Sequence, residues 1–259
     1  MINDKLNHHF IPRFYLKYWT NQHNKLWVYD LRHISESKIP NPRLCHIKNI
    51  CSENRLYSIG DDNSLEDWAD KNFEYRCALT FKKINNREIL DNDDIFYTKS
   101  FLALTMARHP LMKNSSEIIC NTFSRNVVLE NPLAQTLTSR MKANLIELDK
   151  LQLQLLCISP DLSMSFITSD IPFIVDWKIS EENVMGFRYK RPTINRVLYP
   201  ISPKVMVFLS EKENILPYLT ISDSDQIRII NYQLITYAND ILIANNNDLL
   251  DHLPPIVPI

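Results

Sequence analysis

The segment Leu151-Gln152-Leu153-Gln154-Leu155 alternates apolar and polar side chains. Such alternation is typical of a β-strand with one buried face, because successive side chains point to opposite sides of a strand. The residues before it, from about Asp93 to Leu148, carry apolar side chains at helical spacing instead. The segment therefore marks the point at which a helical middle gives way to strands.

Strand-like segments lie on both sides of this helical middle. Short strands are expected at residues 26–30, 44–50, 55–59, 164–168, 194–199, 204–209 and 241–244. Helices are expected at about residues 64–84, 93–108, 115–129, 133–148 and 223–238. Strands from both chain ends around a helical middle predict an α+β fold with antiparallel strands. Since no segment resembles a linker, we expect a single α+β domain over residues 1–259.

The composition excludes several classes of protein. The chain holds 29 basic and 30 acidic residues, a balance that argues against a general electrostatic nucleic-acid binder. Only Gly60 and Gly186 are glycines, which excludes the glycine-rich phosphate loops of P-loop, dinucleotide-binding and kinase folds. We expect asparagine and aspartate to form the tight turns in their place. No apolar run is long enough to span a membrane, and the first residues lack the apolar core of a signal peptide, so a cytoplasmic protein is expected.

The five cysteines indicate neither disulfides nor a zinc ribbon. Their number is odd and no Cys-x-x-Cys spacing occurs. Cys45, His46 and Cys51 lie close together, but a structural zinc site needs four ligands, and no second cluster supplies the rest. Buried reduced thiols are the simpler interpretation.

Residues 7–16, Asn-His-His-Phe-Ile-Pro-Arg-Phe-Tyr-Leu, contain the first unusual motif. The stretch 9–16 with Trp19, together with Thr168-Ser169-Asp170-Ile171-Pro172, resembles a bacterial domain-of-unknown-function family whose members open with HxxPxxYLxxF and later carry TSDxP. The resemblance extends from residue 8 to about residue 244 and implies an organisation of the chain, without an established activity. Residues 8–13 are also similar to the first motif of HNH nucleases, although no matching glycine-rich turn or downstream ligands follow.

Charged and polar residues near these motifs are the candidates for chemistry. Glu66, Asp70 and Glu74 lie at i, i+4 and i+8 of an expected helix and would attract a cation, either an arginine or a divalent metal. Arg108 lies on an apolar face of a helix, so it needs a carboxylate partner, with Glu74 the first choice and Asp170 the second. A solvated acidic face and a structural ion pair are the alternatives.

Two interpretations follow. In the first, the protein is a hydrolase of the phosphodiesterase or nuclease type acting on a nucleotide or nucleic acid. His9 is its general acid or base and Asp170 and Glu74 are its carboxylates. Its substrate-binding residues would be Arg13, Tyr15, Arg108, Thr168 and Ser169.

In the second interpretation, the protein is a non-catalytic binding or interaction module, and the same residues form a structural polar network. The Thr168–Asp170 segment would then make an Asx or Ser/Thr turn. An open cleft around these groups would favour the enzyme, and burial of the groups would favour the network. The substrate, the oligomeric state and the biological pathway are left open by the sequence.

Overall fold

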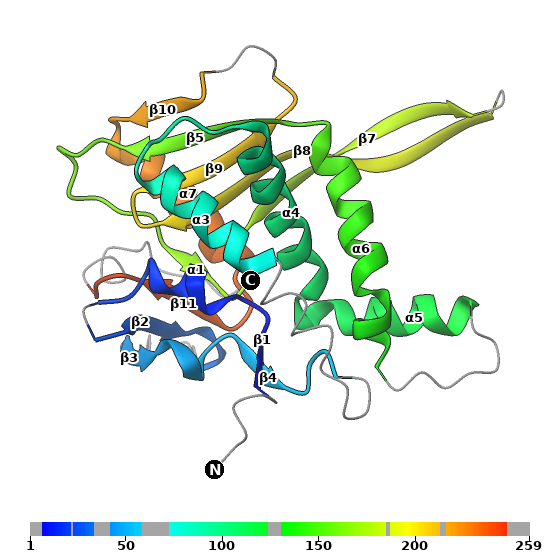
Figure 1. Cartoon of the computed structure of the whole chain (residues 1–259), viewed down its shortest axis with the longest axis horizontal. Helices are drawn as coiled ribbons and strands as arrows, with labels where there is room; N and C mark the ends of the chain where they lie inside the picture. The colour runs from blue at the N-terminus through cyan, green and yellow to red at the C-terminus, as the bar shows by residue number, and fades with distance from the viewer. Residues whose placement is uncertain are drawn as a thin grey trace. The chain divides into compact units, whose positions relative to one another are not determined.

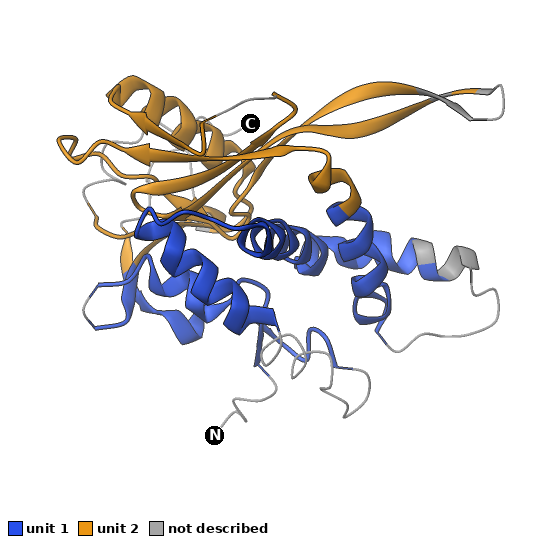
Figure 2. Cartoon of the chain, turned by 45° about the horizontal axis from the view of Figure 1, so that its top comes forward, with its two compact units in different colours: residues 1–26, 44–145 blue, residues 27–43, 146–259 orange. Residues whose placement is uncertain are grey.

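The computed structural model describes residues 7–21, 23–33, 42–58, 73–123, 131–184, 187–212 and 216–247. Its chain divides into two compact units, coloured separately in Figure 2. Unit 1 comprises residues 1–26 and 44–145, and unit 2 comprises residues 27–43 and 146–259. The chain therefore enters unit 2, returns to unit 1 and enters unit 2 again, and each unit is described below by itself.

Unit 1 is mainly helical. Its helices are α1 (Arg13–Lys17), α3 (Tyr75–Asn85), α4 (Asn92–Arg108), α5 (Lys113–Phe123) and most of α6 (Pro132–Asp149). Helices α3 and α4 pack through the rings of Phe81 and Phe101, whose centroids are 4.9 Å apart in an edge-to-face arrangement. The helices predicted at 93–108 and 133–148 are confirmed almost residue for residue.

Helix α4 begins and ends where its local sequence dictates. The Asp91 carboxylate accepts a hydrogen bond from Asp94 N, and the Asp94 carboxylate accepts one from Asp91 N, which together form a capping box. The helix ends at Arg108, two residues before Pro110, because proline disfavours helical backbone at the residue before it. From Thr98 onward all of its side chains are buried.

A short two-stranded ribbon carries the first histidines. Strand β1 (Asn7–His9) pairs antiparallel with β4 (Ser52–Asn54), and His9 lies opposite Ser52. The strand expected at residues 55–59 is wrong in its position, since the strand lies at 52–54 and residues 55–57 form a turn. Cys51 and Arg55 flank β4 with φ angles of 52° and 56°, so left-handed residues end the strand on both sides.

Unit 2 is built on a five-stranded sheet with the order β10-β5-β9-β8-β7 (Figure 1). Its strands are β5 (Gln152–Ile158), β7 (Ile174–Val184), β8 (Phe187–Ser202), β9 (Val205–Ser210) and β10 (Tyr218–Ile221). Strand β10 runs parallel to β5, and the other neighbouring strands are antiparallel. The antiparallel pair predicted at 194–199 and 204–209 is confirmed as part of β8 and β9.

The second sheet joins distant parts of the sequence in the order β3-β2-β11-β6. Its strands are β2 (Lys25–Asp30), β3 (Arg43–His46), β6 (Thr168–Ser169) and β11 (Ile241–Ala244). Strand β11 lies antiparallel to β2, with Ile241 opposite Asp30, so the strands from the two chain ends are neighbours as predicted. Only the first part of the strand expected at 44–50 forms, because residues 47–49 make a 3-10 turn.

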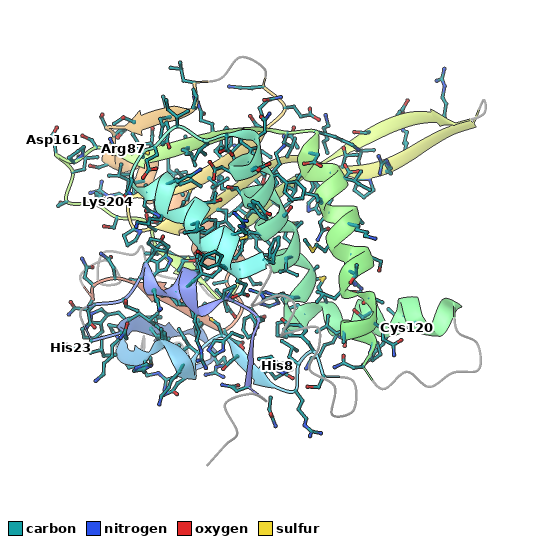
Figure 3. The ribbon with its side chains drawn as sticks, viewed as in Figure 1. His8, His23, Arg87, Cys120, Asp161 and Lys204 are labelled. Carbon is teal, nitrogen blue, oxygen red and sulfur yellow. The ribbon has the colours of Figure 1, made fainter. Side chains whose placement is uncertain are left out.

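The strand predicted at residues 164–168 is wrong in its bounds. Strand β6 covers only Thr168–Ser169 and pairs with β11. The residues before it are held by Lys204, labelled in Figure 3, which donates hydrogen bonds to the carbonyl oxygens of Leu162 and Met164 at 2.9 and 2.6 Å. A partly buried ammonium group thus takes the place of a sheet ladder, and this desolvation lowers the pKa of Lys204.

The fold class is α+β, as the sequence predicted. Helix α7 (Ser224–Tyr237) lies between β10 and β11 in the chain and confirms the helix expected at 223–238. Within the described ranges, no helix combines the length and apolar character needed to cross a membrane. The single domain over residues 1–259 stays a prediction.

Candidate functional site

His9 lies at the end of β1 and is almost fully enclosed, with an exposed fraction of 6%. Burial lowers its pKa to about 4, and the positive charges of Arg13 and Arg108 act in the same direction. The backbone groups of Ile47 and Asn7 near the ring oppose this shift without cancelling it. The imidazole of His9 is therefore neutral at pH 7.

Arg108 is a buried cation of unit 1, and its predicted ion pair with Glu74 is confirmed, whereas its role in substrate binding stays a prediction. Its exposed fraction is 2%, and its Nη1 atom donates to Glu74 Oε1 at 3.0 Å. The Nε atom donates to the carbonyl oxygen of Phe10 at 2.8 Å. The guanidinium thus joins helix α4 both to Glu74 and to the backbone that follows His9.

Three further polar side chains adjoin this ion pair and were given no role from the sequence: Tyr57 and His8 adjoin it through hydrogen bonds, and His109 through a ring contact with Phe10. Tyr57 donates its hydroxyl proton to the Arg108 carbonyl oxygen at 2.8 Å, and its amide donates to His8 Nδ1 at 3.0 Å. His109 Nδ1 accepts from the Leu111 amide at 3.2 Å. Figure 3 labels His8 beside the β1–β4 ribbon. His8, His9, Tyr57, Glu74, Arg108 and His109 are called the histidine–arginine cluster below.

Little in the sequence could have identified Tyr57 and His8. Their contact joins residues 49 positions apart through a backbone amide, and no side-chain pattern encodes such a contact. His109 carried a weak signal, since it directly follows Arg108 and precedes Pro110. A histidine before a proline-initiated turn is well placed to accept from a backbone amide two residues on.

Arg13 and Tyr15, both predicted to bind substrate, lie on the short helix α1. Arg13 is exposed to solvent. Tyr15 is buried among aromatic rings, with centroid distances of 6.2 Å to Trp19 and 6.4 Å to Phe101. The Tyr15 ring therefore contributes to packing in unit 1. Glu66 and Asp70, the other members of the acidic stripe, lie outside the described residues.

Asp170 belongs to unit 2, and backbone amides use both of its carboxylate oxygens. Oδ1 accepts from Asn239 N at 3.1 Å, and Oδ2 accepts from Asp240 N at 2.8 Å. Burial raises the pKa of this carboxyl group, and the backbone hydrogen bonds oppose that rise. With an exposed fraction of 3%, the side chain fixes the turn between α7 and β11.

Ser169 and Thr168 are fully buried in β6. Ser169 Oγ accepts from the Ile171 amide at 3.1 Å and donates to the Ile171 carbonyl oxygen at 2.6 Å. This is a Ser/Thr turn, the alternative to a functional strand end that the sequence left open. Ser169 thus holds the proline-containing turn of its own motif, and Thr168 lies opposite Ile243 of β11.

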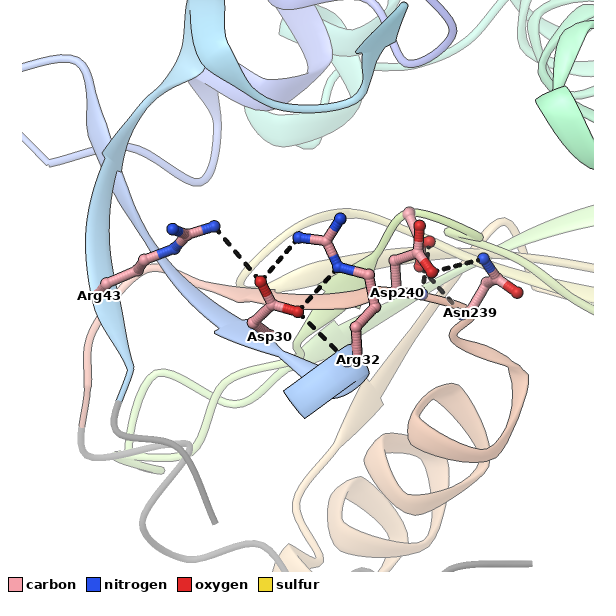
Figure 4. Close-up of polar contacts among 6 residues, drawn as sticks. Asp30, Arg32, Arg43, Asn239 and Asp240 are labelled. Atoms are coloured by element: carbon pink, nitrogen blue, oxygen red, sulfur yellow. Dashed lines mark hydrogen bonds and ion pairs between the residues drawn. The ribbon is translucent and has the colours of Figure 1, made fainter. Parts of the chain in front are cut away.

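The second polar cluster lies in unit 2 and centres on Asp30 (Figure 4). Arg32 binds the Asp30 carboxylate through Nε and Nη2 at 2.9 and 2.7 Å, and Arg43 Nη2 approaches it at 3.4 Å. The hydrogen bond to Asp30 raises the pKa of Arg32, and the charges of Asp240 and Asp170 contribute less. Sequence reasoning missed Asp30 because it assigned the residue only to a strand end.

The predicted site residues thus fall into two sets. His9, Arg13, Tyr15, Glu74 and Arg108 belong to unit 1, and Thr168, Ser169 and Asp170 belong to unit 2. Within unit 1, Glu74 and Arg108 form an ion pair, and His9 lies near enough for the charge of Arg108 to lower its pKa. A shared site of His9 and Asp170 stays a prediction. Across the described ranges, His, Cys, Asp and Glu side chains form no group of three or more that could hold a metal ion.

Comparison with known proteins gives one match. A model of a protein family of unknown function matches residues 7–248 and therefore includes both polar clusters. No curated protein and no solved structure matches the chain.

Proposed function

Because the chain belongs to the DUF4238 family of proteins of unknown function, we propose its function from the geometry alone: a non-catalytic binding module. In this proposal the histidine–arginine cluster and the Asp170 turn stabilise the two units, and recognition takes place elsewhere on the surface. The observation that carries the proposal is the enclosure of His9, a residue that is 6% exposed and whose pKa is lowered to about 4.

Acid–base chemistry makes two demands that this arrangement meets poorly. A general acid or base is most effective when its pKa lies near the working pH, and it must reach the proton that it transfers. His9 is neutral at pH 7 and enclosed. Arg108, expected to hold an anion, already donates to Glu74 and to the Phe10 carbonyl oxygen. These bonds support a structural role for both groups.

The competing proposal is a phosphodiesterase or nuclease that acts on a nucleotide or nucleic acid, with a divalent metal as its cofactor. A turnover assay separates the two. We would incubate the protein with bis-p-nitrophenyl phosphate, single-stranded DNA and RNA, with Mg²⁺ or Mn²⁺, and compare it with His9→Gln. Glutamine keeps a polar side chain but cannot act as an acid or base.

The binding-module proposal predicts no turnover above the protein-free rate for either form. It also predicts that His9→Gln lowers the melting temperature by several degrees, since the ring is packed within unit 1. Arg228→Gln serves as the control, because Arg228 is exposed and forms a surface ion pair with the neighbouring Asp225 on α7. Turnover that disappears in His9→Gln at an unchanged melting temperature would overturn the proposal.

A further inference from the structure

The five-stranded sheet of unit 2 has one face that helix α7 covers only in part. A pocket with a volume of about 300 Å³ lies between this face and the helix. Leu156, Leu198 and Phe208 form its sheet side, and Ile229 and Ile230 form its helix side. The volume lies at the lower end of the range of about 300–1,000 Å³ that is usual for ligand sites, so the pocket suits a small ligand.

The strand register explains why these side chains share a face. Leu198 of β8 lies directly opposite Phe208 of β9, and Arg196 lies opposite Ser210 two positions along. Residues two apart on a strand point to the same side, so Arg196 projects from the face that carries Leu198 and Phe208. Arg196 also lines the pocket. An apolar pocket thus has one cation in its lining.

Arg196 has hydrogen-bonding capacity left for a ligand. Its Nε atom donates to Asp176 Oδ2 across the β7–β8 pair. Among the residues that the structure describes, its two terminal nitrogens make no hydrogen bond, and the side chain is 41% exposed. Asp176 therefore orients the guanidinium through Nε and leaves the two terminal nitrogens for a ligand. A carboxylate binds well to a guanidinium through paired N–H donors.

From this combination we infer that the pocket between α7 and the sheet binds a small amphipathic carboxylate. Its apolar chain lies against Leu198, Phe208 and Ile230, and its carboxylate accepts hydrogen bonds from Arg196. Charge complementarity selects this occupant over an apolar peptide or a cationic ligand, because arginine is the charged residue of the lining. The inference rests on the proposed binding function and names a ligand class for it.

Calorimetric titration with three matched probes tests the ligand class. Sodium octanoate, 1-octanol and octylammonium chloride share one alkyl chain and differ only in the head group. At pH 7 we expect one octanoate per chain, bound about tenfold or more tightly than octanol, because a charge-assisted hydrogen bond replaces a neutral one. Octylammonium binds most weakly. Equal affinities for octanoate and octanol, or no binding of any probe, would overturn the inference.

Two variants of the ion pair make the test specific to Arg196. Arg196→Gln removes the advantage of octanoate over octanol while the affinity for octanol stays within about twofold. Asp176→Asn strengthens octanoate binding, because the variant keeps a hydrogen-bond acceptor for Nε but removes the negative charge that repels an incoming carboxylate. The control is Arg228→Gln, because Arg228 lies on helix α7 but does not line the pocket. It leaves both affinities unchanged. A preference for octanoate that persists in Arg196→Gln contradicts the inference.

The opposite response of Asp176→Asn keeps the test valid even when Arg196→Gln fails to fold. Thermal unfolding of each variant identifies such a failure. The turnover assay on His9→Gln is a separate readout, so the two proposals fail separately. Turnover by the wild type together with octanoate binding overturns only the binding-module proposal. Absence of both turnover and octanoate binding overturns only the ligand class.

Discussion

At the scale of single residues, Arg108 shows how a charged side chain is accommodated inside unit 1. The guanidinium is buried, yet it pairs with Glu74 and with the Phe10 carbonyl oxygen, while its own carbonyl oxygen accepts from Tyr57. Removing one partner of a buried ion pair is more costly than replacing the whole pair, because the remaining charge is left without compensation.

Arg108→Met should therefore lower the free energy of unfolding by about 3–5 kcal/mol, since it leaves Glu74 without its cation. Urea denaturation followed by circular dichroism measures this change. Glu74→Gln should cost less, because the amide oxygen still accepts from Nη1 and the side chain lies nearer the solvent. In contrast, Arg228→Met, at an exposed pair, should stay within about 0.5 kcal/mol of the wild type. A loss below about 1 kcal/mol for Arg108→Met would refute the structural role.

The Arg108–Glu74 pair was predictable because both signals are local. Helical spacing placed Arg108 on an apolar face, and elementary electrostatics then required a carboxylate. The contacts of Asp170 were not predictable in the same way. Its partners are backbone amides about 70 positions away, at Asn239 and Asp240, and a backbone amide leaves no trace in the sequence.

At the scale of elements, a helix whose ends are marked by a capping motif and a proline was predicted best. Helix α4 has a capping box at its start and Pro110 after its end, and its predicted and observed bounds differ by one residue. The segment at 164–168 carries no such start and stop signals. Its apolar residues fit a strand, but the Lys204 ammonium binds the preceding carbonyl oxygens, and only Thr168–Ser169 pairs.

Turns show a further limit of prediction from residue propensities. With two glycines in the chain, asparagine and aspartate were expected at left-handed positions. Among the described residues, Asn24 fits this expectation, whereas Cys51, Arg55 and Arg87 adopt φ angles of 52°, 56° and 57°. A left-handed conformation costs such residues on the order of 1 kcal/mol each. A tertiary contact accompanies the turn at Cys51, whose carbonyl oxygen accepts from Phe10 N. At Arg87 the bonds are local: Arg87 N donates to the Ile84 carbonyl oxygen and Glu88 N to that of Lys83, at the end of α3.

At the scale of the whole molecule, the path of the chain links the two units. Strand β2 leaves unit 1 at Leu26 and supplies Trp27–Asp30 to the edge of β11, which comes from the far end of the sequence. A single cut near residue 150 cannot release two complete units, because the C-terminal fragment would lose the strand that pairs with β11.

We therefore expect residues 150–259 expressed alone to be insoluble or to unfold without a cooperative transition. Co-expression with residues 1–149 should yield a complex that copurifies on a tag placed on either fragment, since β2 again pairs with β11. Size-exclusion chromatography and thermal unfolding measure both outcomes. A C-terminal fragment that folds alone with a sharp transition would contradict this account of the chain and of the single domain.

In the proposed function, His9 is a buried, neutral side chain instead of a working acid or base. Its folded pKa of about 4 lies below the value near 6.5 of an unfolded histidine, so the native state binds fewer protons between these values. Stability from this group is complete above about pH 6.5 and is lost as the pH falls toward 4, by about 3 kcal/mol in total. His9→Gln should reduce this pH dependence.

NMR titration of the His9 imidazole, assigned by comparison with His9→Gln, measures the pKa itself. We predict a neutral ring from pH 8 to about pH 5, with its midpoint near 4. A midpoint between about 6 and 7.5, in a protein that remains folded, would mean that His9 exchanges protons at working pH. That result would contradict the structural interpretation and restore His9 as a general acid or base.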